Sequence, residues 1–247
     1  MTELWIKAIP GIPLIKPGDD LPQIIAKALQ ESDITLQDRD VLVISSKIVS
    51  KSEGRFVHLD DVTPSERARQ VAEETSKDPR IVELVLQEST AISRQAYNLL
   101  VVQHRLGFVS ANAGIDQSNV GKNDTVLLLP QDPDASAEKI RQALGGNIGV
   151  VISDTHGRPF RMGNIGVAIG VAGLPALVDL RGETDLFGRE LRISVQGYAD
   201  LVASAAHIVC GEGAEGLPVV LIRGLAYTHT DGHASDLNRP AEQDLYR

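Results

Sequence analysis

The sequence is poor in cysteine, in aromatic residues and in positive charge, and each shortage excludes a class of protein. The single cysteine, Cys210, excludes an intrachain disulfide framework and a cysteine-rich zinc site. Aromatic residues make up 4% of the chain, too few for the base-stacking surfaces of single-strand nucleic-acid binders. The net charge of -9 argues against a surface for duplex DNA or RNA. An anionic small molecule can still bind where metal ions intervene.

Long hydrophobic runs are also missing. No stretch approaches 18 uninterrupted apolar residues, and the N-terminal segment lacks the basic flank and apolar core of a signal peptide. The chain is nevertheless 43% hydrophobic over 247 residues, which is enough for a sizeable core. These features predict a globular, cytoplasmic protein that binds neither membranes nor nucleic acids.

Helical and strand-like patterns mix along the chain without strict alternation. The patterns predict helices over 21–32, from Thr63, from Pro79, over 132–144 and over 199–210, and strands over 40–44, 99–104, 108–111, 125–129, 163–173, 191–196 and 217–223. Thr63 is expected to cap its helix, with Glu66 completing a capping box. The mixture favours an α+β fold with mixed, largely antiparallel sheets and packed helices over a doubly wound sheet. We expect one module over 1–247, with two interleaved subdomains as an alternative and a polar tail over 231–247.

The segment VVISDTHGRPFR, Val150 to Arg161, is the most informative stretch. Its apolar start predicts the end of a buried strand at Ile152, followed at once by a polar loop. In such a loop an acid and a hydroxyl, Asp154 and Thr155, can hold a cation. The alternative is an ordinary turn in which Asp154 accepts hydrogen bonds from its own backbone.

Three other polar loops follow apolar elements. In the first, Ser45 to Arg55, the cations Lys47, Lys51 and Arg55 recur at a spacing of four and would share one face of a helix. The second, Asn112 to Asn119, offers Asp116 as a cation ligand. The third, GEGAEG from Gly211 to Gly216, can wrap phosphates, and a metal ion would reconcile Glu212 with those anions.

Several familiar motifs are excluded. The sequence has no Walker loop, and GEGAEG follows a helix, which is the wrong context for a Rossmann fingerprint. No GxSxG motif supports a serine hydrolase. His207 falls in an apolar helix and is interpreted as a packing residue, while His156 is given an accessory role at most. The acids Asp116, Asp154 and Glu212 are hard oxygen ligands that suit Mg²⁺ or Mn²⁺.

Taken in order, the motifs GIPLIKPGDDL, SSKIVSKSEGR, ANAGIDQSN, SDTHGRPFR, GETDLFGREL and GEGAEGLP resemble the coenzyme F420-0:L-glutamate ligase family, also called gamma-glutamyl ligases. The resemblance runs from about Ile9 to Leu225. It is to the short form of the family, without the C-terminal nitroreductase-like domain of some members. It implies an α+β fold that differs from the ATP-grasp ligases and from Rossmann folds.

The resemblance also implies a chemistry. Family members use GTP to form an amide between L-glutamate and the carboxylate of a deazaflavin precursor, through an acyl phosphate, and release GDP and phosphate. Some add further gamma-linked glutamates. They use two divalent cations, Mn²⁺ or Mg²⁺, with K⁺, and they are homodimers. The same acids and glycines would also serve a metal-dependent phosphate-ester or nucleotide hydrolase, or a nucleotide-binding module without catalysis, and these stay open as alternatives.

Roles of single residues follow from the matching motifs. Catalytic roles are implied for Asp116, Asp154 and Lys51. Metal ligands are implied at Asp116, Asp154, Thr155 and Glu212. Nucleotide contacts are implied for Ile12, Pro13, Leu14, Ile15, Ser46, Lys51, Asn119, Cys210, Gly211, Gly213, Ala214, Glu215 and Gly216.

Overall fold

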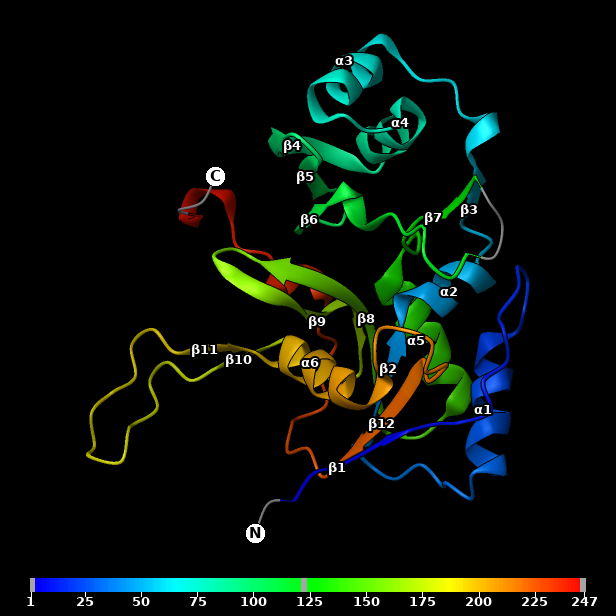
Figure 1. Ribbon diagram of the computed structural model, residues 1–247. Helices are drawn as coiled ribbons and strands as arrows, with labels where there is room; N and C mark the ends of the chain where they lie inside the picture. Colours follow the sequence, from blue (N-terminus) through cyan, green and yellow to red (C-terminus); the bar gives the residue numbers. More distant parts are fainter. Residues whose placement is uncertain (1–2, 121–123, 245–247) are drawn as a thin grey trace.

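A five-stranded sheet forms the centre of the molecule, and the computed structural model describes it within residues 3–120 and 124–244 (Figure 1). In sheet order its strands are β1 (Trp5–Ala8), β12 (Val219–Arg223), β2 (Val41–Ser45), β8 (Gly149–Arg158) and β9 (Arg161–Ala172). β2 and β8 run parallel, and the other neighbouring pairs are antiparallel. The predicted α+β class with mixed, largely antiparallel sheets is therefore confirmed.

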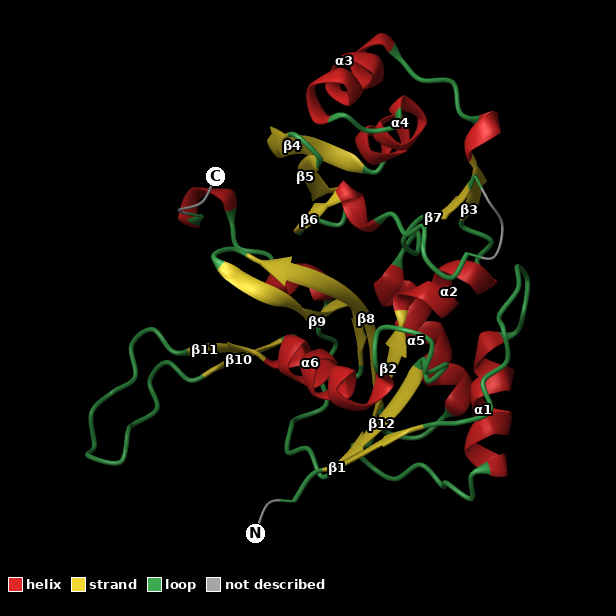
Figure 2. Ribbon diagram, in the orientation of Figure 1, coloured by secondary structure: helices red, strands yellow, loops and turns green. Residues whose placement is uncertain are grey.

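Helices cover both faces of this sheet (Figure 2). They are α1 (Leu21–Glu31), α5 (Pro133–Leu144) and α6 (Tyr198–Cys210), and a short helix α2 (Ser46–Ser52) follows β2. Along β2, Leu42 and Ile44 pack with α1 and α5, whereas Val41 and Val43 pack with α6. A strand covered on both faces is apolar at successive positions, which explains the continuous apolar run there.

Two glycines let the helices approach β9 closely. A Cβ at Gly170 would lie 2.5 Å from the carbonyl oxygen of Pro133 in α5, and one at Gly166 would lie 2.6 Å from that of Ala203 in α6. Such distances leave no room for a side chain without moving a helix. Of the glycines predicted to pack closely in residues 163–173, Gly166 and Gly170 do so against helices and Gly173 against the Ile148 carbonyl, whereas a Cβ at Gly163 would meet nothing within 4 Å.

A smaller unit, residues 59–114, stands beside one end of the sheet, and we call it the small lobe; the sheet with α1, α2, α5 and α6 is the sheet lobe. The small lobe contains α3 (Glu66–Thr75), α4 (Pro79–Gln87), β4 (Ser89–Ala96), β5 (Leu99–His104), β6 (Val109–Ala111) and short 3-10 helices at Leu59–Asp61 and Asn112–Gly114. The paired strands β3 (Phe56–His58) and β7 (Thr125–Leu127) join it to the sheet lobe. In Figure 1 it lies at the top, in cyan and green.

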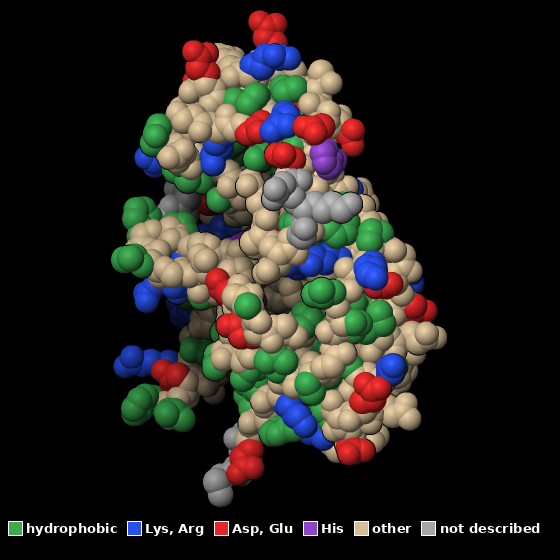
Figure 3. All heavy atoms as spheres, turned by 45° about the vertical axis from the view of Figure 1, so that its right-hand side comes forward, with side chains coloured by type: hydrophobic (Ala, Val, Ile, Leu, Met, Phe, Trp, Pro, Cys, Tyr) green, Lys and Arg blue, Asp and Glu red, His purple; other side chains and the backbone are tan. Residues whose placement is uncertain are grey.

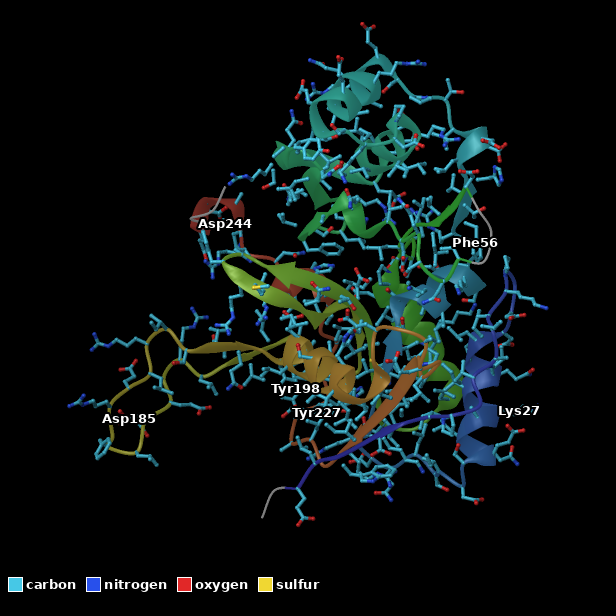
Figure 4. All side chains as sticks on the ribbon, viewed as in Figure 1. Lys27, Phe56, Asp185, Tyr198, Tyr227 and Asp244 are labelled. Atoms are coloured by element: carbon cyan, nitrogen blue, oxygen red, sulfur yellow. The ribbon has the colours of Figure 1, made fainter. Side chains whose placement is uncertain are left out.

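An arm extends from the sheet lobe on the opposite side from α1 (Figure 1). It contains the antiparallel strands β10 (Leu177–Asp179) and β11 (Val195–Gly197) and the loop between them. Figure 4 labels Asp185 on this loop, away from the body of the protein. The polar tail that follows β12 has short 3-10 helices at Ala234–Leu237 and Ala241–Gln243, and its last three positions, 245–247, lie outside the described residues.

Most predicted elements are confirmed, but strands β3, β4 and β10 are not predicted, and several boundaries differ. β8 does not end at Ile152 but continues to Arg158, because its pairing with β9 persists after β2 has left the sheet. Ser65, not Thr63, caps α3, since its side chain accepts the Ala68 N–H. The strand predicted over 191–196 is only Val195–Gly197.

No helix within the described ranges is both long and apolar enough to cross a membrane.

Candidate functional site

The predicted polar segments meet at one edge of the central sheet. β1 and β2 end there, and β12, which runs antiparallel between them, begins there. The Ser45 N–H donates to the Pro218 carbonyl at 2.9 Å, and the Ile9 N–H donates to the Val219 carbonyl at 2.8 Å. Ser45 also pairs with Ser153 of β8. Four segments that are far apart in sequence are therefore neighbours in space. They are the segments that follow Ile9, Ser45 and Ser153 and the segment that precedes Val219.

β8 changes partners at this edge. A bulge lies between Ile152 and Ser153, where β2 turns into α2 and β8 continues with β9 alone. Bulges bend a strand and redirect its side chains. Beyond the bulge, successive side chains alternate between the two sides of the strand. Asp154 and His156 share the side of α2, while Ser153 and Thr155 share the side of α6.

Asp154 is held by one hydrogen bond at each carboxylate oxygen. Ser46, the first residue of α2, donates its hydroxyl to Oδ1 at 3.3 Å. The Nε2 of His156 lies 3.0 Å from Oδ2, and since a carboxylate only accepts, Nε2 carries the proton. The Asp154 side chain is 19% exposed. Each oxygen keeps a further lone pair that a cation could use.

Asp116 is paired with a lysine. Its Oδ2 lies 2.5 Å from Lys47 Nζ, and Oδ1 accepts the backbone N–H and the hydroxyl of Ser118 at 2.6 and 2.7 Å. Burial would raise the pKa of Asp116, but the hydrogen bonds from Lys47 and Ser118 outweigh it and hold the pKa below its usual value. Asp116 is therefore an anion whose charge this lysine balances.

Lys51 and Asn119 connect three of the polar segments. Lys51 Nζ donates to the Asn119 carbonyl at 2.8 Å, and the Asn119 side-chain amide donates to the Gly213 carbonyl at 3.4 Å. Burial, assisted by the nearby charge of Lys47, lowers the pKa of Lys51. Lys47 and Lys51 thus extend from one face of α2, as their spacing predicts. Arg55 lies beyond the helix and is directed elsewhere, to the Leu129 carbonyl and Glu88.

The glycine-rich segment Gly211 to Gly216 forms a tight loop with left-handed backbone at both ends, φ +68° at each glycine. Glu215 folds back over the loop, and its Oε2 accepts the Gly213 N–H at 2.8 Å. Burial raises the pKa of the neighbouring Cys210 thiol, which favours the neutral form. The loop is therefore closed by its own carboxylate, which an anionic ligand would have to displace to reach that N–H.

On the α6 side, His207 lies between a serine and an acid. Its Nε2 is 3.3 Å from the Ser153 hydroxyl, and its Nδ1 is 3.8 Å from Glu212 Oε1. Burial lowers the pKa of His207, although the charge of Glu212 opposes the shift. Ser153 is 3% exposed. A buried hydroxyl is unsuited to attack a bound substrate, so the arrangement argues against a serine hydrolase.

The predicted nucleotide segment Ile12 to Ile15 follows β1 at the same edge. Ile15 is buried and Ile12 packs against the same core, whereas Leu14 is 87% exposed. The segment is tied to the end of α2, since the Gly18 N–H donates to the Ser52 carbonyl at 2.9 Å. Leu14 therefore presents an apolar side chain to solvent. Figure 3 shows the surface hollowed between the two lobes.

The predicted metal ligands fall into two pairs. Asp116 and Asp154 lie on the α2 side, where a Cβ at Gly114 would be only 3.4 Å from Asp154 Oδ2. Thr155 and Glu212 lie on the α6 side of β8. Within the described part of the chain, no three His, Cys, Asp or Glu side chains are close enough to share one ion. The donor types suit hard cations, and the roles of Asp116, Asp154 and Glu212 as metal ligands stay predictions.

Sequence reasoning missed three residues of the site. Lys47 had a signal, because its spacing from Lys51 placed both on one helix face. His207 had none, because its contact with Ser153 joins residues 54 positions apart. The sequence predicts at most an accessory role for His156, whereas its ring contacts Asp154.

Comparison with known proteins gives a consistent family. The family model described as F420-0:Gamma-glutamyl ligase matches residues 11–224. A Coenzyme F420:L-glutamate ligase of Methanothermobacter thermautotrophicus is 46% identical over 245 residues, covering 97% of each chain. Proteins of the same name from Natronomonas pharaonis and Methanocaldococcus jannaschii are 47% and 42% identical, over 97% and 96% of this chain and 93% and 94% of theirs. The protein therefore belongs to the F420-0:gamma-glutamyl ligase family.

Proposed function

We propose that the protein is a GTP-dependent ligase that joins L-glutamate to the carboxylate of the deazaflavin precursor of coenzyme F420. Its relatives are named for ligation of glutamate to coenzyme F420. The observation that carries the proposal is the meeting of carboxylates, lysines and a glycine-rich loop at one sheet edge. Acidic and basic groups placed together suit a reaction between two anions, GTP and a carboxylate.

The proposed reaction follows from leaving-group chemistry. A carboxylate is a poor acyl donor, because the leaving group would be oxide. Its oxygen therefore attacks the γ-phosphorus of GTP, the bond to the β-phosphate oxygen breaks, and GDP leaves. The amine of glutamate then attacks the carbonyl carbon of the acyl phosphate, the bond to the phosphate oxygen breaks, the amine loses a proton, and phosphate leaves. Positioning and charge stabilisation are the protein's main contributions to such a transfer.

The chain's own groups have distinct proposed parts in this reaction. Lys51 and Asn119 would bind the phosphates of GTP, with the loop at Gly213 closing over them. Leu14 would contact an apolar part of the nucleotide.

Divalent cations, Mn²⁺ or Mg²⁺, would be held by Asp116 with Asp154 on one side of β8 and by Thr155 with Glu212 on the other. Bound there, they would neutralise the phosphate charge. K⁺ is a further proposed ion.

A homodimer is the proposed assembly, and the arm supports it. Leu186 is 100% exposed, Phe187 89% and Ile193 90%. Apolar side chains gathered on an extended segment are typical of an interface. We expect a dimer in light scattering after gel filtration, and a shift towards monomer for the double variant Leu186→Glu, Phe187→Glu. The control variant Asp33→Asn is changed in an exposed loop after α1, far from the arm in sequence, and it should stay dimeric.

The direct test is an incubation with the deazaflavin precursor, GTP, Mn²⁺ and L-glutamate, followed by mass spectrometry. One or more added glutamyl masses, with GDP and phosphate, are expected, and omission of glutamate should abolish the amide product. The alternative hydrolase would release phosphate from GTP or a phosphate ester at the same rate with or without glutamate. That result, or a product made with ATP and not with GTP, would refute the assignment.

A further inference from the structure

The imidazole of His156 lies between Asp154 and the small lobe. Its Nε2 is 3.0 Å from Asp154 Oδ2, and its ring centroid is 5.0 Å from that of Phe108, with the two planes tilted by 52°. The His156 side chain is 13% exposed, so both contacts are shielded from water. Phe108 directly precedes β6 of the small lobe. The ring of Phe108 in the small lobe thus contacts His156 in the sheet lobe, and His156 in turn contacts Asp154.

Phe108 is itself fixed by its own lobe. It stacks on His104 at 4.9 Å between centroids, with the planes 2° from parallel. His104 is fully buried, and its Nδ1 accepts the Leu106 N–H at 3.0 Å. The turn between the two rings is closed by a hydrogen bond from the His104 N–H to the Phe108 carbonyl. Phe108 is therefore held in place by the small lobe, and it also packs against the core of the sheet lobe.

An ion-pair cluster of Glu88, Arg55 and Arg105, which we call the ionic joint, connects the small lobe to the sheet lobe. Glu88, at the end of α4, accepts a hydrogen bond from Arg55 at one oxygen and from Arg105 at the other, both at 2.9 Å. Arg55 also donates to the Leu129 carbonyl, and Arg105 to the Pro130 carbonyl. Burial alone would raise the pKa of Glu88, but its interaction with His104 and the hydrogen bond and charges of the two arginines outweigh burial and lower the pKa to about 2. The joint connects α4 to the segment that leads from β7 into α5.

The orientation of the Asp154 carboxylate depends mainly on its contact with His156. Its other oxygen accepts only the 3.3 Å contact from Ser46, and a carboxylate turns easily about its last torsion. Hydrogen bonds to metal-binding carboxylates are known to tune affinity by orienting the ligand. We propose that His156 is a positioning residue for Asp154, and that the small lobe sets its orientation through the ring of Phe108. The inference rests on the proposed role of Asp154 as a cation ligand.

The test measures binding of Mn²⁺ alone to the full chain, from the free-ion signal in electron paramagnetic resonance. His156→Leu should weaken Mn²⁺ binding about tenfold, the low end of the range for residues that support a metal ligand. His156→Gln keeps an N–H at similar reach and should stay within about threefold of wild type. His58→Leu, changed at a half-exposed histidine of β3, is the matched control and should bind as wild type.

The coupling to the small lobe is tested with Phe108→Leu, which keeps an apolar side chain but removes the flat ring. Alone it should weaken Mn²⁺ binding by about threefold, a share of the effect of losing His156. Combined with His156→Leu it should add nothing, because the ring acts through the imidazole. Thermal unfolding of each variant separates loss of positioning from loss of fold.

Three results would overturn the proposal. The first is wild-type Mn²⁺ affinity in a folded His156→Leu variant, and the second is failure of His156→Gln to restore binding. The third is additive weakening in the double variant, which would show that Phe108 does not act through His156. If the wild-type chain binds no Mn²⁺, the proposed metal site itself is wrong, and the inference falls with it.

Discussion

Asp116 and Asp154 flank the first turn of α2, and they are balanced in different ways. Asp116 faces the ammonium of Lys47 at 2.5 Å, whereas Asp154 accepts from the hydroxyl of Ser46 and the imidazole of His156. Among the described residues, no lysine or arginine lies within ion-pair distance of Asp154. A carboxylate that already has a cation gains less from a second one. The comparison therefore points to Asp154 as the stronger partner for an added metal ion.

The largest expected effect is that of removing the Asp154 charge. Asp154→Asn keeps the size of the side chain and one of its two accepting oxygens, so the fold should survive. Turnover should fall by about 1,000-fold, since charge stabilisation by a metal ion contributes several kcal/mol. The measurement is the rate of glutamyl product formation at saturating GTP and Mn²⁺.

Asp33→Asn is the matched control for that substitution. Asp33 already has a left-handed backbone, φ +53°, which asparagine accepts readily, and it lies in an exposed loop. Near-normal turnover of Asp154→Asn would show that Asp154 is not needed for activity, and it would contradict the contrast drawn between Asp154 and Asp116.

A smaller loss is expected at Asp116. Asp116→Asn should reduce turnover about 100-fold, less than Asp154→Asn, because Lys47 already offsets part of the charge of this proposed ligand. Lys47→Met removes the balancing cation but leaves the carboxylate, so its loss should be nearer to tenfold. Both are measured in the same product assay. A greater loss for the Lys47 variant would identify the ammonium, rather than the carboxylate, as the functional group of this pair.

The smallest effect is on stability and depends on pH. The pKa of Asp116 is lower in the folded chain than in the unfolded one, so its contribution is present above the unfolded pKa and is lost as pH falls through the folded value. Wild type should exceed Asp116→Asn by about 1 kcal/mol at pH 7 in urea unfolding, and the difference should shrink below about pH 4. A difference that is constant down to pH 3 would show that Lys47 does not stabilise the ionised form.

Local patterns predicted the elements well because local chemistry determines them. Asp20, Asp78 and Asp132 cap α1, α4 and α5, each with a proline in the first turn of the helix that follows. These signals lie within a few residues of one another. The α+β class followed from the irregular order of such elements.

The site was only partly predictable, because its geometry depends on residues that are distant in sequence. The polar segments could be named one by one, and their meeting at one edge needed the insertion of β12 between β1 and β2. The local pattern does not predict the end of β8, because the continuation of this strand depends on its pairing with β9. The grouping of ligands into two pairs depends on the alternation of side chains along that extended strand.

The position of β12 also has a consequence for biosynthesis. Trp5 pairs with Arg223, so strands from distant parts of the sequence meet in the sheet, and β12 lies between β1 and β2. The central sheet therefore cannot form completely until residue 223 has left the ribosome. Contacts at such sequence separation slow folding. A nascent or truncated chain that stops short of β12 leaves the facing edges of β1 and β2 unpaired, and it lacks the segment before Val219 that contributes to the site. Such a chain would depend on chaperones to avoid aggregation, because its substrates could not yet bind and stabilise it.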